Sequence, residues 1–187
     1  MRLALLDANV LYGAFSRDVL LRLAAAGLYR PRWTDRIEAE WVGALLAARP
    51  DLAPERLART RAAMARAFPD AAVSGYEGRE DDLQLPDPDD RHVLAAAVEA
   101  QVGEVVTWNL SDFPAAVLAP LGVEAASPDA FVGSMLEEDP DRVVAAMRAH
   151  RAGLHRPPLT TGQYLGHLER AGLVRVVAAL VERTDDL

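Results

Sequence analysis

The chain lacks cysteine and lysine altogether: none of its 187 residues is cysteine, and all 20 basic residues are arginine. The absence of cysteine excludes disulfides, thiolate nucleophiles and cysteine-ligated zinc, and it favours a reducing cytoplasm. The absence of lysine excludes a P-loop, a lysine Schiff base and lysine-dependent phosphotransfer. The apolar run within MRLALLDANV is too short for a signal peptide, and no later run is long enough to span a membrane. We therefore expect a cytoplasmic protein that does not bind a membrane.

The net charge of −8 is distributed unevenly along the chain. Residues 1–66 contain 11 arginines and 7 acidic residues, whereas residues 67–187 contain 9 arginines and 21 acidic residues. An arginine-rich N-terminal third would suit contact with phosphate groups. The alternative is that these arginines only solvate the outer faces of helices, and charge alone does not separate the two interpretations.

Hydrophobic periodicity alternates between strand and helix over the first 136 residues. Strands are predicted at 3–9, 71–76, 104–109 and 123–127, and helices at 16–28, 34–50, 52–69, 87–101, 113–121 and 127–136. This order predicts an α/β fold in which a parallel sheet carries helices on both faces.

The composition changes after about residue 138, where two or three helices are predicted on either side of the segment HRPPLT. We therefore predict a main domain over 1–136 and a helical C-terminal extension over 137–187. The larger side chains of this extension are expected to pack against the main domain rather than bind a cofactor. They are Tyr164, Leu165, Leu168 and Leu173.

The stretch LPDPDDRHVLAAAVEA, at 85–100, places three aspartates and a proline directly before an apolar helix. Asp87 is the predicted N-cap, and the carboxylates of the first turn favour the positive end of the helix dipole. Asp90 precedes Val93 and Leu94 by three and four residues, so it lies on the stripe that faces the core. A carboxylate that points inward requires a partner from elsewhere in the chain.

Three more acidic residues are candidates for that partner. Asp7 ends the first predicted strand, and Asp112 follows the strand that contains VVTWN. Glu40 lies three residues after Ile37, near the apolar stripe of its predicted helix, whereas Glu38 falls nearer the outer side. Because strand ends and helix N-termini meet at one edge of such a sheet, all four acids are expected to line one crevice.

Clustered carboxylates repel one another unless a cation holds them together. Hard oxygen ligands select Mg²⁺ or Mn²⁺ rather than zinc, and such a site can bind phosphate oxygens and activate water. The neutral side chains expected to support the site are Asn9, Thr107 and Asn109.

Two other kinds of side chain have alternative interpretations. His92, near the start of the 87–101 helix, is either a phosphate contact or an ordinary surface residue. The tryptophans stack on bases or, as the commoner case, pack in the core or in a partner groove. They are Trp33, Trp41 and Trp108.

Four segments of the chain resemble those of the PIN-domain ribonucleases, in particular the VapC-like toxins of bacterial toxin–antitoxin pairs. They are LLDANVLY, TDRIEAEW, PDPDDRHVLAAA and VVTWNLSDFP, which follow the family's order and spacing over residues 1–135. The resemblance implies a PIN-like three-layer α/β/α fold with a short central parallel sheet. It also implies that Asp7, Glu40, Asp90 and Asp112 are the catalytic acids and that the three aspartates bind the metal. Asn109 replaces an acid found in some members.

The activity that this resemblance implies is Mg²⁺- or Mn²⁺-dependent endoribonuclease hydrolysis of RNA, with a cognate antitoxin in the active-site groove and a homodimer as the common assembly. The arginines that would then contact the RNA backbone are Arg17, Arg30, Arg32 and Arg36. The alternative is a catalytically silent PIN-like module that binds RNA or a protein. A haloacid-dehalogenase-type phosphatase or a receiver domain is disfavoured, because both need a lysine and the former needs a second aspartate at position 9.

Overall fold

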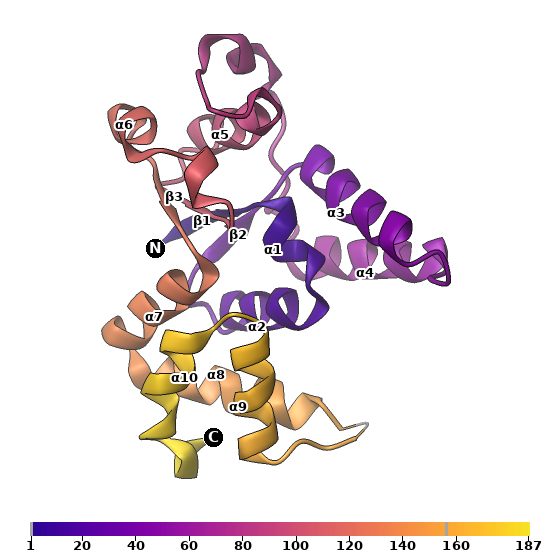
Figure 1. Ribbon diagram of the computed structural model, residues 1–187, viewed down its shortest axis with the longest axis vertical. Coiled ribbons are helices and arrows are strands. Elements are labelled where there is room, and N and C mark those ends of the chain that lie inside the picture. The colour runs from indigo at the N-terminus through magenta and orange to yellow at the C-terminus, as the bar shows by residue number, and fades with distance from the viewer. Residues whose placement is uncertain (1, 156) are drawn as a thin grey trace.

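A parallel sheet of four strands forms the centre of the computed structural model, which describes residues 2–155 and 157–187 (Figure 1). The strands are β1 (Leu3–Leu6), β2 (Arg30–Arg32), β3 (Glu104–Val106) and β4 (Glu124–Ala126). Their order across the sheet is β2-β1-β3-β4. Leu5 pairs with Arg32 on one side and with Val105 on the other, so β1 is a central strand. The residue that follows β1, Asp7, therefore stands near the middle of the sheet's carboxyl edge.

Helices cover both faces of this sheet. In the first 138 residues they are α1 (Ala8–Tyr12), α2 (Ala14–Ala25), α3 (Asp35–Ala48), α4 (Pro54–Ala67), α5 (Arg91–Glu99), α6 (Ala115–Leu118) and α7 (Pro128–Glu138). Figure 1 shows α5 and α6 on one side of the sheet, α2 and α7 on the other, and α3 with α4 extending away from it. The predicted three-layer α/β/α fold is confirmed.

Short 3₁₀ turns lie between several of these elements, and one of them shapes the site. The turns are Glu77–Asp82, Pro88–Asp90, Leu110–Asp112, Ala119–Leu121 and Thr184–Asp186. The Asp87 carboxylate accepts a hydrogen bond from the Asp89 amide at 2.9 Å, so it caps the turn that leads directly into α5. Asp90 consequently stands at the N-terminus of α5, as the helical pattern predicts.

The strand predicted at 71–76 is wrong, and the strand β2 replaces it in the sheet. Around Ala72 the chain runs beside Trp33 and forms one isolated bridge, with the Trp33 amide donating to the Ala71 carbonyl at 3.0 Å. β2 has the sequence Arg-Pro-Arg, which shows neither alternation nor an apolar run, so the pattern could not reveal it. Its position next to β1 is set by pairing and by the burial of Pro31.

The C-terminal extension consists of α8 (Pro140–Gly153), α9 (Thr161–Arg170) and α10 (Val174–Val181), which gather beyond α2 in Figure 1. Tyr164, Leu168 and Leu173 are buried and Leu165 is half-buried, which confirms their predicted packing role. The imidazole of His150 lies 2.9 Å from the Tyr164 hydroxyl. No helix in the described ranges is both long and apolar enough to cross a membrane.

Candidate functional site

Asp7 follows β1 and is fixed by several hydrogen bonds. Its amide donates to the Val106 carbonyl at 3.1 Å, which ties the end of β1 to β3. Its carboxylate is only 5% exposed and accepts hydrogen bonds from the Ala8 amide, from Asn9 Nδ2 at 2.7 Å and from Thr107 Oγ1 at 2.8 Å. Burial raises the pKa of Asp7, and the charge of Glu40 adds to the rise, while the hydrogen bonds from Thr107 and Ala8 oppose it.

The predicted neutral residues surround this carboxylate. Thr107 is fully buried directly after β3, and its hydroxyl also accepts hydrogen bonds from Asn9 Nδ2 at 2.9 Å and from the Asn109 amide at 3.0 Å. The Asn9 side-chain oxygen in turn accepts from the Trp108 amide at 3.0 Å. Asn9 and Thr107 therefore orient Asp7, whereas Asn109 contributes its backbone amide.

Asp90 is half-buried at the N-terminus of α5, and three other aspartates influence its ionisation. Burial is the largest cause that raises the pKa of Asp90 to about 6, and the charges of Asp7, Asp87 and Asp112 raise it further. Asp112, which is half-buried at the end of the turn after β3, therefore lies within electrostatic reach of Asp90. The structure thus brings three of the predicted acids to one edge of the sheet.

Glu40 lies beside this group, but the helical-phase expectation for its exposure is wrong. Its side chain is 39% exposed, whereas Glu38, expected on the outer side, is only 8% exposed and pairs with Arg61 of α4 at 2.8 Å. The reason is that α4 packs against α3 and covers the side on which Glu38 lies. When a second helix covers another face of a helix, the sequence of that helix alone does not show which of its polar residues are buried.

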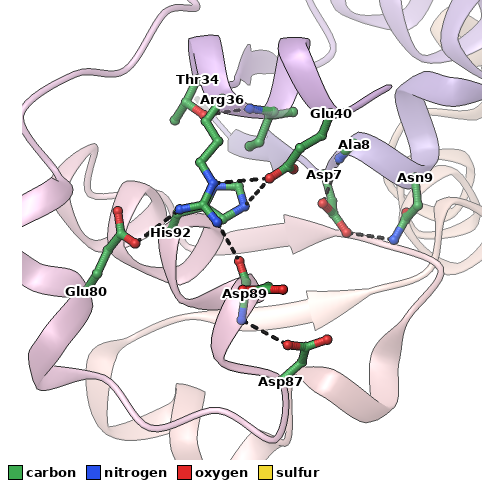
Figure 2. Close-up of polar contacts among 11 residues, drawn as sticks. Asp7, Ala8, Asn9, Thr34, Arg36, Glu40, Glu80, Asp87, Asp89 and His92 are labelled. Atoms are coloured by element: carbon green, nitrogen blue, oxygen red, sulfur yellow. Dashed lines mark hydrogen bonds and ion pairs between the residues drawn. The ribbon is translucent and has the colours of Figure 1, made fainter. Parts of the chain in front are cut away.

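The Glu40 carboxylate is bound by two cationic or hydrogen-donating partners (Figure 2). Arg36 Nε donates to Glu40 Oε1 at 3.2 Å, and His92 Nε2 lies 3.1 Å from the same oxygen. Burial opposes ionisation of Glu40, but the contacts with His92 and Arg36 outweigh it and lower its pKa. Glu40 is therefore held ionised, in an orientation fixed from both α3 and α5.

His92 is buried, whereas the sequence suggested a phosphate contact or a surface residue. It is 1% exposed, not a surface residue, and its Nδ1 is buried without a hydrogen-bond partner within the described part of the chain. The available signal was its place in a helix that is apolar on nearly every side, since α5 buries every residue from His92 to Ala97. Its contact makes it a positioning residue for Glu40.

Two of the four predicted RNA-binding arginines already contact other groups of the protein. Arg36 also donates to Glu80 at 3.3 Å and to the Asp89 carbonyl at 3.3 Å, as Figure 2 shows. Arg17 donates to the Leu11 carbonyl and lies over the ring of Trp41, 4.7 Å from its centroid. The other two differ: Arg32 is half-buried against the Pro31 carbonyl, and Arg30 is exposed.

The donor set fits a hard divalent cation by its chemistry, because Asp7, Asp90 and Asp112 all offer carboxylate oxygens. However, these carboxylates are spaced more widely than a metal-binding site requires. Across residues 2–155 and 157–187, no three histidine, aspartate or glutamate side chains stand close enough together to hold one ion. Binding would therefore require the Asp90 and Asp112 side chains to turn toward the fixed Asp7.

Two family models match the chain. One, described as PIN domain, matches residues 4–111, and the other, described as VapC50 C-terminal domain, matches residues 128–182. The first covers more than half of the chain, so the protein belongs to the PIN-domain family, and the pair of matches confirms the predicted VapC-like kind. Asp7, Glu40 and Asp90 fall inside the PIN match, and Asp112 follows directly after it.

A curated relative from Mycobacterium tuberculosis carries the name "Putative ribonuclease VapC50". The two chains are 35% identical over 79 residues, which is 42% of this chain and 47% of the relative. The match thus spans about half the length of that relative. No solved structure matches the chain at a significant level.

Proposed function

We propose that the protein is a metal-dependent endoribonuclease that hydrolyses RNA phosphodiester bonds, as the toxin of a VapC-type toxin–antitoxin pair. One observation carries the proposal: Asp90 lies within electrostatic reach of Asp7 and Asp112, and burial together with nearby charge raises its pKa to about 6. Carboxylates gathered from three segments at the carboxyl edge of a parallel sheet destabilise the fold unless a cation binds them. Membership of the PIN-domain family and the ribonuclease name of the relative support the same reaction.

Each acidic residue has a separate role in this proposal. Asp7, Asp90 and Asp112 hold Mg²⁺ or Mn²⁺, which when bound supplies Lewis-acid stabilisation of the charge on the phosphate oxygens. Asp7 is preoriented by the hydroxyl of Thr107 and needs no rearrangement. Glu40, kept ionised by its contacts, completes the acidic site and orients the attacking water by accepting a hydrogen bond from it.

The partners and the organisation of the chain are part of the same proposal. We propose a cognate antitoxin that covers the acidic site, a homodimer as the working assembly and the cytoplasm as the location. We also propose a nuclease unit over 1–136 and a helical extension over 137–187. The helix α7 connects the two, since it packs against β4 as well as against α8 and α10.

The test is cleavage of total RNA by the purified protein in EDTA, in Mg²⁺ and in Mn²⁺, with Asp90→Asn and Asp89→Asn variants alongside. Asp89 is an exposed neighbour of Asp90, so its variant removes the same charge outside the acidic site. Cleavage that requires a metal, vanishes in Asp90→Asn and persists in Asp89→Asn supports the nuclease. Cleavage that continues in EDTA, or that Asp90→Asn leaves unchanged, contradicts it.

The second candidate is a catalytically silent PIN-like module that binds RNA or a protein. The wide spacing of the carboxylates and the engagement of Glu40 by Arg36 and His92 favour it. This candidate predicts RNA or partner binding that neither EDTA nor Asp90→Asn changes, with no cleavage under any of the three metal conditions.

A further inference from the structure

A groove of about 400 Å³ lies between the carboxyl edge of the sheet and the C-terminal helices. It is lined by Asn9, Tyr12 and Trp108 from the first part of the chain and by His167 and Arg170 of α9. These lining residues therefore come from both of the segments that the two family models match separately.

The groove adjoins the acidic site through one side chain. Asn9 lines the groove and also donates to the carboxylate of Asp7 at 2.7 Å. The amide of Trp108, one residue after Thr107, donates back to the Asn9 side chain. A ligand in the groove would consequently lie one residue away from Asp7.

The indole of Trp108 is held in the groove by the turn between α9 and α10. A Cβ at Gly172 would lie 2.8 Å from Cη2 of this indole, which is too close for any side chain. Gly172 also has a φ of +84°, a conformation that favours glycine. The turn thus supports the edge of the indole while 37% of Trp108 stays exposed, and Tyr12 nearby is exposed to the same extent.

The lining residues from α9 provide groups that suit a phosphate. The imidazole of His167 stacks on the ring of Phe15, with centroids 5.3 Å apart and planes inclined by 28°, so its orientation is fixed. Arg170 is exposed, and it has no carboxylate within ion-pair distance in the part of the chain described. It differs in this from Arg36, whose guanidinium is already paired.

We propose that this groove binds one or two nucleotides of single-stranded RNA next to the scissile phosphodiester. The base stacks on Trp108 with Tyr12 beside it, and the phosphate is bound by Arg170 and His167. Two exposed aromatic rings together with an exposed arginine favour RNA over an apolar protein segment. The inference rests on the proposed ribonuclease function, and it gives the C-terminal helices the role of substrate binding.

The test measures the affinity of a fluorescein-labelled single-stranded RNA of mixed sequence, about 20 nucleotides long, by fluorescence anisotropy. The Asp90→Asn protein is used so that the RNA stays intact. Three substitutions are added to this protein one at a time: Trp108→Leu, Arg170→Ala and, as a matched control, Arg175→Ala. Arg175 is also exposed on the C-terminal helices, but it lies near Glu137, outside the groove.

We expect Trp108→Leu to weaken RNA binding by roughly 5- to 100-fold, as loss of one stacked base does. Arg170→Ala should weaken it and reduce the slope of log affinity against log salt by about one, while Arg175→Ala changes neither beyond about twofold. Because Arg170 is exposed, its variant tests the groove even if Trp108→Leu fails to fold.

Unchanged RNA affinity in both Trp108→Leu and Arg170→Ala overturns the inference. It is also overturned if these variants keep their RNA affinity but lose a protein partner that copurifies with the parent protein. The failure of the proposed function gives a different result: the wild-type protein then binds RNA in a Trp108-dependent manner but does not cleave it with any metal. That result leaves the groove assignment standing.

Discussion

Replacing Asp90 by asparagine is expected to stabilise the metal-free protein while it destroys the proposed activity. The carboxyl of Asp90 has a pKa of about 6 in the folded protein against an ordinary value of 3.8, because of burial first and then the charges of Asp7, Asp87 and Asp112. The folded state therefore binds the proton more tightly than the unfolded state does. Ionising Asp90 costs stability, and asparagine, which is neutral and nearly isosteric, removes that cost.

The sign and size of the effect follow from the two pKa values. Below about pH 4 the carboxyl is protonated in both states and contributes no penalty. The penalty grows as pH rises from about 4 to about 6 and is constant above that. A fully buried group would lose about 3 kcal/mol over this range. Because Asp90 is only half-buried, solvent screening reduces the expected loss to about 1.5 kcal/mol.

The assay is thermal unfolding in EDTA at pH 7.5 and at pH 4, with Asp89→Asn as the control for loss of charge. For a chain of this length we expect Asp90→Asn to raise Tm by about 3–6 °C at pH 7.5, with the difference largely lost at pH 4. Millimolar Mg²⁺ should raise Tm of the wild type but not of the variant. An Asp90→Asn protein that is no more stable than Asp89→Asn at pH 7.5 would refute the reasoning that the clustered carboxylates destabilise the fold.

Two further predictions concern buried polar groups, both measured by chemical denaturation. Thr107→Val removes the hydroxyl that donates to Asp7 and should lower the unfolding free energy by about 1–3 kcal/mol. Thr107→Ser keeps a hydroxyl and should cost less. Equal losses in the two variants would contradict the hydrogen-bond role. Arg61→Ala leaves the buried carboxylate of Glu38 without its partner and should cost about 2–4 kcal/mol, against less than about 0.5 for the exposed Arg59→Ala. Similar values for the two arginines would show that the Glu38 pair contributes little.

The residues at the ends of strands could be located from the sequence because strand ends carry a pattern signal. The apolar run before Asp7 and the run VVT before Trp108 predict buried strands, and parallel topology places both ends at one edge. β2 lacked such a signal, because three residues of Arg-Pro-Arg gain their place only from pairing with β1. The segment around Ala72 showed the opposite case, an apolar run that forms only one bridge.

The helical acids could not be located in the same way, because burial on a helix depends on which helices pack against it. Glu38 is buried only because α4 supplies Arg61 to meet it. Glu40 belongs to the site through His92, 52 positions further along the chain, and no local pattern encodes that contact. Single-sequence periodicity predicts the presence of a helix better than it predicts the polar partners of that helix.

The acidic site contains one carboxylate that hydrogen bonds hold in place, Asp7, and one that carries an unfavourable charge, Asp90, and this difference has a physical consequence. Asp7 accepts three hydrogen bonds that orient it before any cation arrives, whereas Asp90 carries the unfavourable charge and makes no side-chain capping hydrogen bond among the described residues. A cation that binds both would relieve the repulsion at Asp90 without reorganising Asp7. The stability lost in the metal-free protein is then recovered on metal binding. Asp90→Asn should therefore be more stable without metal and unable to gain stability from it.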